Sequence, residues 1–421
     1  MLCANTIDTL GKECSKFGNF TYKYKGITEI LPLAFIDDLN GISDCGRKSL
    51  ELNVYITSKI ELKKLKFGKN KCFKMHVGKR NDMCPSLKVH GETMAEVSEV
   101  CYLGDIISAD GKNTKNIKDR TAKGIGLISQ IFNILNSVSF GSYTFQISLL
   151  LRNLILVNGM LTNAETWYNL TAAELKDFEK IDRLFFMKLF EVPRSTPMIA
   201  FYLETGSLPL WVMIKVRRLI YLHTILKSPK TGMLYRVFII QWKFPAPGDW
   251  ILQVRDDLMD FDLPSDLEWL SRKSANVFKT LVKKKARLFA FQELESKKET
   301  YKKLKSLKYS ELKVENYLMD EKFRYDEKKT LFQFRTRMAK FGNNFKSGKI
   351  LTICPLCKLH FDDQSLCLKC PKIRKQIECD IDISDLFTEN ISSKTAKVLS
   401  EVVNIRAKLK NNEEHLNVPA M

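Results

Sequence analysis

Two adjacent acidic residues, Asp37 and Asp38, stand between apolar residues that are typical of β-strands. Because charged pairs are poor strand residues, the pattern predicts a β-hairpin with Asp37 and Asp38 at or near its turn. A tight turn lets both carboxylates approach one place, where they repel each other unless a cation lies between them. Mg²⁺, which takes oxygen ligands and keeps water ligands for a phosphate substrate, suits such a pair. A solvated Asp-Asp turn is the alternative interpretation, since a two-residue signal is weak evidence.

Four cysteines form two Cys-x-x-Cys pairs, Cys354 with Cys357 and Cys367 with Cys370, and nine residues separate the pairs. Four thiolates can hold Zn²⁺ tetrahedrally, and Cys-x-x-Cys turns suit structural zinc sites. Metal binding would fold a segment that is otherwise too polar to make a core. The other cysteines of the 11 in the chain are scattered. That distribution fits a reducing compartment and one metal site better than a disulfide framework.

The composition is that of a soluble globular protein with a polyanionic partner. The chain has 421 residues, 45% hydrophobic and 28% charged, which allows two or three domains and a sizeable core. Its 68 basic and 48 acidic residues give a formal net charge of +20, which favours nucleic acid or an acidic membrane surface as partner. No secretory signal follows Met1, and the most apolar stretch, 147–161, is too short to span a bilayer. We therefore expect an intracellular protein, nuclear or cytoplasmic, that makes no use of a membrane.

The residues around the acidic pair resemble a known family. Phe35-Ile36-Asp37-Asp38 looks like the aromatic-x-Asp-Asp motif of reverse transcriptases, and residues 7–14 and 40–43 are similar to the palm of non-LTR (LINE-type) retrotransposon polymerases. In that family the Asp pair lies on a hairpin and binds the catalytic metal. The resemblance therefore implies Asp37 and Asp38 as ligands of a two-metal Mg²⁺ site. It covers residues 3–370 and depends on the order of the motifs rather than on any one of them.

Two further motifs follow in the order that the family shows. Lys71 precedes alternating, strand-like residues and matches the lysine that approaches the incoming nucleotide; a solvated lysine on an edge strand is the alternative. Tyr102, Leu103 and Gly104 resemble the primer-grip hairpin, which holds the 3′ end of the primer against the metal site. Gly104 between apolar strand residues also indicates a close backbone approach. An ordinary hairpin is the alternative here.

A helical pattern begins at residue 113, and its first segment is basic. The family implies a helical thumb at this point, and the phosphates of a template–primer duplex would be natural partners for basic side chains. A solvated basic face is the alternative. The residues concerned are Lys115, Lys118, Arg120 and Lys123. Further along, Phe185, Phe186, Leu189 and Phe190 are more typical of a core than of a stacking surface.

The cysteine cluster departs from the family pattern. The family usually shows Cys-x2-Cys followed by His-x3-Cys, but Leu366 occupies the histidine position when the sequences are aligned on Cys370. Cys367, one residue away, is one replacement ligand, and His360 is another. If neither reaches the metal, the resemblance implies a site that binds zinc weakly or not at all.

The predicted fold class is α+β. A partial right-hand polymerase palm, with a small antiparallel sheet and helices, precedes a mostly α-helical thumb, a C-terminal helical region and a small zinc knuckle. The predicted segments are the partial palm (1–112), helical thumb and connection (113–228), a Pro-rich, linker-like segment (229–270), a basic helical region (271–350), the cysteine cluster (351–375), and a C-terminal helix and tail (376–421).

The resemblance also limits the function that we expect. In the family, a fingers region and a palm strand with a further catalytic Asp precede the hairpin, and residues 1–30 do not supply them. We therefore expect a truncated RNA-directed DNA polymerase that binds an RNA template and a DNA primer but is not catalytic as this chain alone. The element's own RNA is a further candidate partner. A non-enzymatic nucleic-acid- and zinc-binding module and a decayed retrotransposon remnant are the alternatives.

Overall fold

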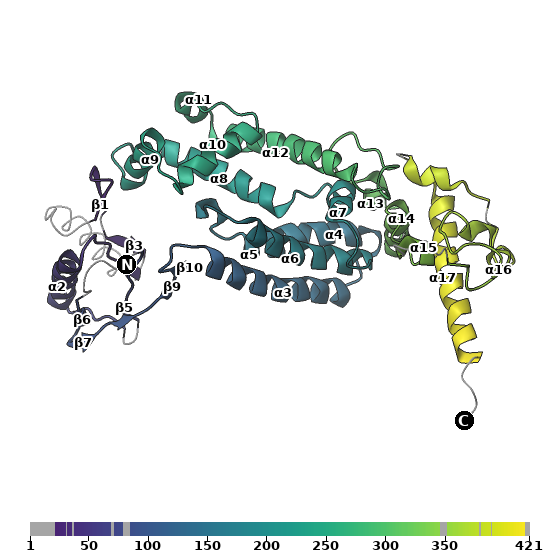
Figure 1. Cartoon of the computed structure of the whole chain (residues 1–421), viewed down its shortest axis with the longest axis horizontal. Helices are drawn as coiled ribbons and strands as arrows, with labels where there is room; N and C mark the ends of the chain where they lie inside the picture. Colours follow the sequence, from purple (N-terminus) through teal and green to yellow (C-terminus); the bar gives the residue numbers. More distant parts are fainter. Residues whose placement is uncertain are drawn as a thin grey trace. The chain divides into compact units, whose positions relative to one another are not determined.

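The computed structural model describes residues 22–30, 32–35, 38–68, 71–78, 85–345, 352–378, 380–388 and 390–416. Within them the chain is mixed α+β and mostly helical, which agrees with the predicted class (Figure 1). The chain divides into two compact units. Unit 1 contains residues 1–119, 163–171 and 217–279, and unit 2 contains residues 120–162, 172–216 and 280–421. Three helices contribute residues to both units: α3 (Thr114–Ser137), α8 (Leu210–Lys227) and α12 (Ala275–Lys298).

The named strands of the described residues all lie in unit 1 and form pairs rather than the one small sheet that was predicted. The antiparallel pairs are β1 (Tyr22–Tyr24) with β2 (Thr28–Ile30), β3 (Leu33–Phe35) with β4 (Asp38–Asn40), β6 (Lys88–Val89) with β7 (Glu92–Thr93), and β9 (Glu99–Tyr102) with β10 (Asp105–Ser108). The strands β5 (Phe73–Lys74) and β8 (Ala95–Glu96) pair in parallel. Two-stranded pairs have little stability alone, so packing on helices must hold them.

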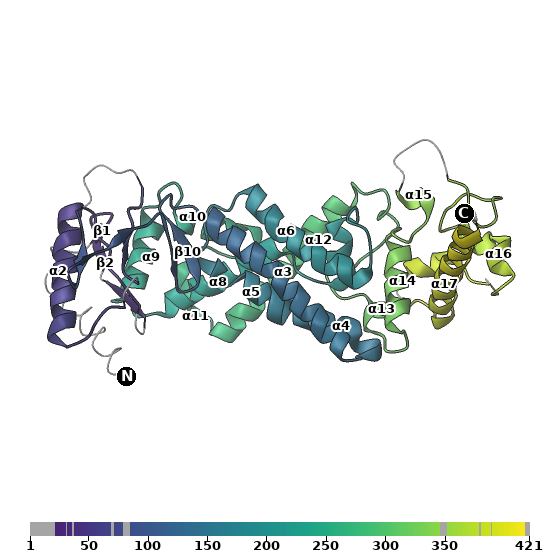
Figure 2. The ribbon, with the colours of Figure 1, turned by 90° about the horizontal axis from the view of Figure 1, so that it is seen from below.

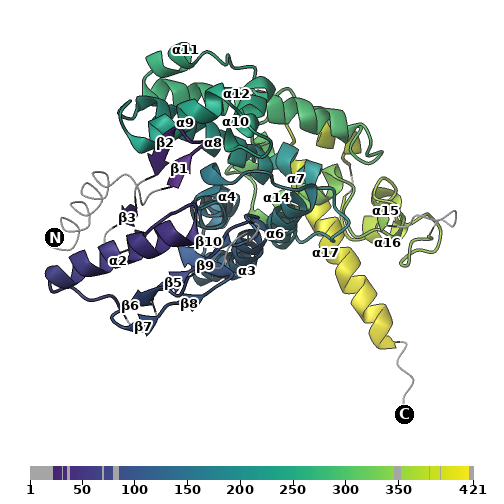
Figure 3. The same cartoon turned by 60° about the vertical axis from the view of Figure 1, so that its left-hand side comes forward.

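One such helix is α2 (Gly46–Leu62). Its apolar residues at positions 52, 56 and 60 recur at helical spacing, and Leu52 and Ile60 are buried. The side-chain amide of Asn53 donates to the carbonyl oxygen of Lys88 at 2.8 Å. This bond ties α2 to β6, beside which it lies (Figure 3).

Residues 229–270 fold mainly into helices, so the prediction of a linker-like segment there is wrong. It contains α9 (Met233–Lys243), α10 (Trp250–Asp260) and α11 (Leu267–Arg272). Their inward faces are buried, as at Phe238, Ile251 and Leu258. The prolines at 245, 247 and 264 stand between these helices, where proline ends a helix without disturbing its interior. They are therefore helix boundaries within unit 1.

The core of unit 2 is aromatic. Phe185, Phe186 and Phe190 are fully buried, which confirms the prediction that they belong to a core. Phe190 stacks on Phe332 with ring centroids 3.8 Å apart. The helices of this part of unit 2 are α4 (Thr144–Leu151), the π-helix η3 (Arg152–Val157), α5 (Asn158–Met160), α6 (Ala172–Phe190) and α7 (Met198–Thr205).

The C-terminal part of unit 2 is built on two helices that pack together, α14 (Tyr325–Arg335) and α17 (Ser393–Leu416), as Figure 2 shows. Leu399 and Val402 on α17 are fully buried. The shorter elements are α13 (Asn316–Met319), α15 (Gly342–Phe345), η5 (Cys367–Lys369), α16 (Pro371–Arg374) and η6 (Ile383–Phe387).

Among the described residues, no single helix has both the length and the apolar character that a bilayer crossing needs. The bent pair α7 and α8 meets these criteria only when the two helices are taken together.

Candidate functional site

The acidic pair lies where the sequence places a hairpin. Strands β3 and β4 are antiparallel, and Phe35 pairs with Asp38. This register leaves two residues between the strands, Ile36 and Asp37, which lie outside the described residues. Asp38 is the first residue of β4 and is exposed. The predicted hairpin is therefore confirmed, while a metal site shared by Asp37 and Asp38 stays a prediction.

The segment from Tyr102 to Gly104 forms the tip of the β9–β10 hairpin. Tyr102 pairs with Asp105, and the two residues between them have positive φ angles of 49° at Leu103 and 85° at Gly104. Two left-handed residues in a two-residue turn match the right-handed twist of the flanking strands. The glycine is therefore explained by turn geometry, since it lies in the turn rather than inside a strand. The side-chain amide of Asn163 donates to the carbonyl oxygen of Leu103 at 3.2 Å and fixes the tip.

The charge of Asp38 acts on Tyr102, although 64 residues separate the two in the sequence. Partial burial raises the pKa of Tyr102, and the negative charge of Asp38 raises it further. The two hairpins that carry these residues are therefore close enough for charge on one to act on the other. The sequence suggested this proximity only through the order of the family's motifs.

Lys71 is exposed and precedes the strand rather than lying on it, since β5 begins at Phe73. The lysine of that strand is Lys74, which is ion-paired with Glu96 at 3.3 Å. The predicted strand beginning after Asn70 is thus shorter than expected. A role for Lys71 beside a nucleotide stays a prediction.

The basic residues of α3 do not form one uniform exposed face. Lys118 and Lys123 are exposed, and Lys115 is ion-paired with Glu99. Arg120 is only 6% exposed. A buried guanidinium cannot reach the backbone of a duplex, so the expected phosphate contact from Arg120 is wrong. Helical periodicity explains the difference, because Arg120 lies on the face that also buries Ile117.

Three of the four predicted zinc ligands come together. The sulfur atoms of Cys354, Cys357 and Cys370 all lie within 4.8 Å of one another, and Cys354 and Cys370 are buried. Cys354 and Cys357 lie on a tight turn, in which the backbone N–H of Cys354 donates to the carbonyl oxygen of His360 at 2.7 Å. Cys370 precedes α16, whose first residue is Pro371. The group can hold a metal ion.

Cys367 is not part of this group. Its side chain is buried, and its sulfhydryl donates to the carbonyl oxygen of Gln364 at 2.9 Å. His360 contributes its backbone oxygen to the turn, and its ring is not in the three-cysteine group. The prediction that Cys367 completes the metal site is therefore contradicted by its position, and the prediction for the ring of His360 is not supported.

The backbone around the three sulfur atoms suits thiolate ligands. Burial acts to raise the pKa of Cys357, but backbone N–H groups of Leu359 and His360 donate to its sulfur and lower the pKa overall. Burial raises the pKa of Cys370 to about 11, against the opposite effect of N–H groups from Ile373 and Lys372. A divalent metal binds the thiolate forms and displaces these protons. The donor set and its N–H groups therefore fit zinc.

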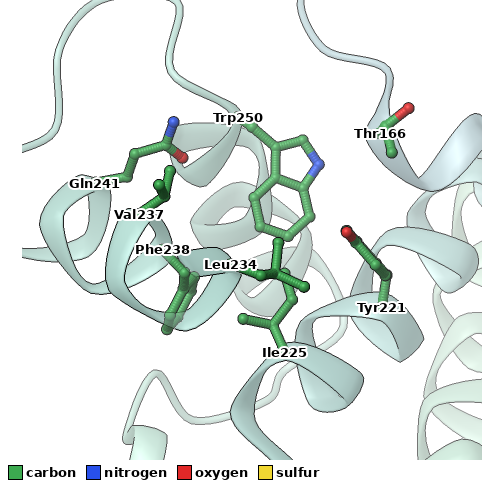
Figure 4. A pocket seen from close by; sticks show the side chains of 8 residues that line it. All are labelled: Thr166, Tyr221, Ile225, Leu234, Val237, Phe238, Gln241 and Trp250. Atoms are coloured by element: carbon green, nitrogen blue, oxygen red, sulfur yellow. The ribbon is translucent and has the colours of Figure 1, made fainter. Parts of the chain in front are cut away.

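Sequence reasoning missed a cavity of about 170 Å³ in unit 1, at the surface of the stretch that was predicted to be a linker (Figure 4). Aromatic and aliphatic side chains line it, with two polar side chains at its rim. The aromatic residues are Tyr221, Phe238 and Trp250, the aliphatic ones Ile225, Leu234 and Val237, and the polar ones Thr166 and Gln241. The apolar residues at 234, 237 and 238 of α9 recur at helical spacing, and this spacing is the sequence feature that could have indicated the helix that lines the cavity.

Comparison with models of known protein families, with curated proteins and with solved structures finds no match.

Proposed function

We propose that this chain is part of a LINE-type reverse transcriptase and that its own activity is nucleic-acid binding supported by a structural zinc ion. The observation that carries the proposal is that two hairpins, β3–β4 with Asp38 and β9–β10 with Tyr102, lie close enough for the charge of Asp38 to act on Tyr102. By the resemblance, Asp38 belongs to the metal-binding hairpin and Tyr102 to the primer grip. In a polymerase these two parts must be neighbours, because the primer end reacts at the metal.

The cysteine group supports the second half of the proposal. Cys354, Cys357 and Cys370 supply three thiolates, the ligand type typical of structural zinc. Zinc bound there would join the Cys354–Cys357 turn to the start of α16. The ion would thus stabilise a segment that buries few large apolar side chains of its own.

The charge of the chain supports nucleic acid as the partner. The net charge of +20 favours a polyanion, and α12 presents Lys283 and Lys284 as exposed neighbours. Not all of the lysines in this region are available, because the ammonium of Lys298 is buried and donates to the carbonyl oxygen of Leu307 at 2.7 Å. Binding would therefore depend on a subset of the basic residues.

We propose no polymerase activity for this chain alone. A two-metal mechanism needs several carboxylates around the reacting phosphate. The resemblance identifies only two of them in this chain, Asp37 and Asp38. In a primer-extension assay with Mg²⁺ or Mn²⁺ and an RNA template, the purified chain should incorporate no nucleotide. Incorporation would overturn this part of the proposal.

Salt dependence tests the binding itself. With about six phosphate contacts, the affinity for a fluorescent RNA–DNA duplex should fall with salt at a log–log slope of about −5. The double variant Lys283→Gln/Lys284→Gln should show a slope shallower by about 1–2. Lys180→Gln is the matched control, because Lys180 is exposed and already ion-paired with Asp177 at 2.7 Å. A flat salt response of the parent would refute nucleic-acid binding and leave the decayed remnant as the better interpretation.

A further inference from the structure

The cavity in unit 1 combines a flat aromatic wall with polar groups on two sides, Gln241 on one side of Trp250 and Tyr221 with Thr166 on the other (Figure 4). Tyr221 from α8 and Trp250 from α10 meet edge to face, with ring centroids 5.9 Å apart and an interplanar angle of 78°. The indole N–H of Trp250 donates to the carbonyl oxygen of Glu165 at 2.8 Å, which fixes the orientation of the ring. The ring therefore offers a held face on which a planar ligand can stack.

The size of the cavity limits the ligand to about one ring system. Sites for drug-sized ligands measure about 300–1,000 Å³, and this cavity measures about 170 Å³. A single planar group fits that volume, with the rest of its molecule in solvent. An isolated base of a single-stranded nucleic acid has this form, because its sugar and phosphates continue outward on both sides.

The orientation of Gln241 follows from its neighbours. The hydroxyl of Tyr24 donates its one proton to the carboxylate of Asp249, at 3.5 Å, and accepts from the amide nitrogen of Gln241 at 3.0 Å. The amide oxygen of Gln241 must therefore face the other way. Figure 4 shows this oxygen turned toward Trp250. The rim of the cavity thus holds a fixed hydrogen-bond acceptor.

Tyr221 supplies the complementary donor. Its hydroxyl is turned into the cavity (Figure 4), and the structure gives it no hydrogen bond to another described residue. Burial and the charge of Glu165 raise the pKa of Tyr221, so the hydroxyl keeps its proton at neutral pH. Thr166 donates its own proton to the carbonyl oxygen of Asn163 at 2.8 Å, which leaves its oxygen as a second acceptor.

We propose that this cavity binds one unpaired base that carries an exocyclic amine, such as adenine or cytosine, from a single-stranded nucleic acid. The base stacks on Trp250, its amine donates to the oxygen of Gln241, and the hydroxyl of Tyr221, on the other side of Trp250, donates to an acceptor on the far side of the base, N3 of adenine or O2 of cytosine. Thymine and uracil have no such amine and fit the rim less well. This site deepens the proposed function and rests on nucleic acid being the partner.

The test uses the full chain and fluorescent octamers of deoxyadenosine, deoxycytidine and deoxythymidine at a moderate salt concentration that weakens phosphate contacts. We expect the adenine and cytosine octamers to bind about tenfold more tightly than the thymine octamer. Trp250→Leu should remove most of this affinity, by about tenfold or more, because stacking on the ring is lost. Tyr221→Phe keeps the ring and should reduce mainly the preference over thymine.

Trp242→Leu is the matched control, because Trp242 lies on α9 in the same unit but does not line the cavity. Circular dichroism and urea unfolding of each variant show whether it folds like the parent. Equal binding of the three octamers, or unchanged affinity in a folded Trp250→Leu variant, would overturn the site. A proline-rich peptide that Trp250→Leu no longer binds, with octamer binding intact, would overturn it in favour of a protein ligand.

The two proposals fail in different ways. If the parent binds octamers with a strong salt dependence that Trp250→Leu leaves unchanged, the base site is wrong and the proposed function stands. If the parent binds neither duplex nor octamer at low salt, both proposals are wrong.

Discussion

Arg335 and Glu204 form a buried ion pair in unit 2. The Nε atom of Arg335 lies 3.0 and 3.1 Å from the two carboxylate oxygens of Glu204, and the two side chains are 3% and 0% exposed. The hydroxyls of Tyr309 and Tyr317 donate to the same carboxylate at 2.7 and 2.8 Å. A second nitrogen of Arg335 reaches Glu315 at 3.0 Å. Four segments of the chain therefore meet at one buried charge.

Glu204→Gln should destabilise the protein strongly. The change leaves the buried Arg335 with Glu315 as its charged partner, and removing one partner of a buried pair costs about 3–5 kcal/mol of unfolding free energy. Urea denaturation followed by circular dichroism measures the change. Glu311→Gln is the control, because Glu311 pairs with Lys313 at an exposed position and should cost less than about 1 kcal/mol. Equal effects of the two substitutions would contradict this account of the network.

Alkaline pH should lower the stability of the protein through Tyr309 and Tyr317, the two tyrosines that donate to the carboxylate of Glu204. Burial first, and the charge of Glu204 second, raise the pKa of Tyr309 and Tyr317 well above 10. Above pH 10 the unfolded chain loses these protons while the folded chain retains them, so stability falls as pH rises. Below pH 10 both states hold the protons, and the contribution is complete. Urea midpoints measured from pH 8 to 11 should therefore decline above pH 10.

Tyr317→Phe separates this contribution from that of other groups that titrate in the same range. The variant loses a hydrogen bond and should be less stable at pH 8, but its stability should decline less steeply above pH 10 than that of the parent. If stability fell with pH equally steeply in parent and variant, the titration of Tyr317 would not contribute to the loss of stability above pH 10.

Local patterns predicted the local features of this fold. Apolar residues indicated the core around Phe185 and Phe190, and an acidic pair between strand residues indicated the β3–β4 hairpin. Each of these depends on residues within a few positions of one another. In the same way, the two Cys-x-x-Cys pairs indicated a metal site.

The errors came from contacts that local patterns do not encode. Arg335 and Glu204 are 131 residues apart, and no spacing rule connects them. Prolines suggested a linker over 229–270, although they stand between helices with buried inward faces. Cys367 has the correct spacing for zinc, but its sulfur lies outside the group that the other three form, and its sulfhydryl donates to the carbonyl oxygen of Gln364. Residue type and spacing thus identified which cysteines could bind a metal, but not which of their sulfur atoms come together.

Zinc content should distinguish the cysteines. Cys370→Ser removes one of the three clustered thiolates and should reduce bound zinc to a small fraction of the parent value, measured by elemental analysis after gel filtration. Cys367→Ser should leave the zinc content near that of the parent, because its sulfhydryl lies outside the group. Loss of zinc from both variants to the same extent would show that Cys367 turns toward the metal when it binds.

Gly206→Ala should be among the most damaging single-methyl additions. Gly206 ends α7 with φ of 59°, a left-handed conformation that costs other residues about 1–2 kcal/mol. A Cβ there would also collide with the backbone carbon of Lys313 and lie 2.5 Å from the nitrogen of Val314. The backbone of this crossing segment is held, since the N–H of Glu315 donates to the carbonyl oxygen of Glu204 at 2.9 Å. The backbone strain and the overpacking add, so we expect Gly206→Ala to lose about 2–5 kcal/mol of unfolding free energy.

Gly26→Ala separates these two causes. Gly26 also has a positive φ, 71°, but a Cβ there would meet nothing within 4 Å. Its substitution should therefore cost only the conformational term, about 1 kcal/mol. Urea midpoints of the two variants, measured under the same conditions, give the comparison. If Gly206→Ala lost no more unfolding free energy than Gly26→Ala, the backbone at Lys313 would have to move aside at little cost. The segment would then be held less firmly beside Glu204 than its hydrogen bonds indicate.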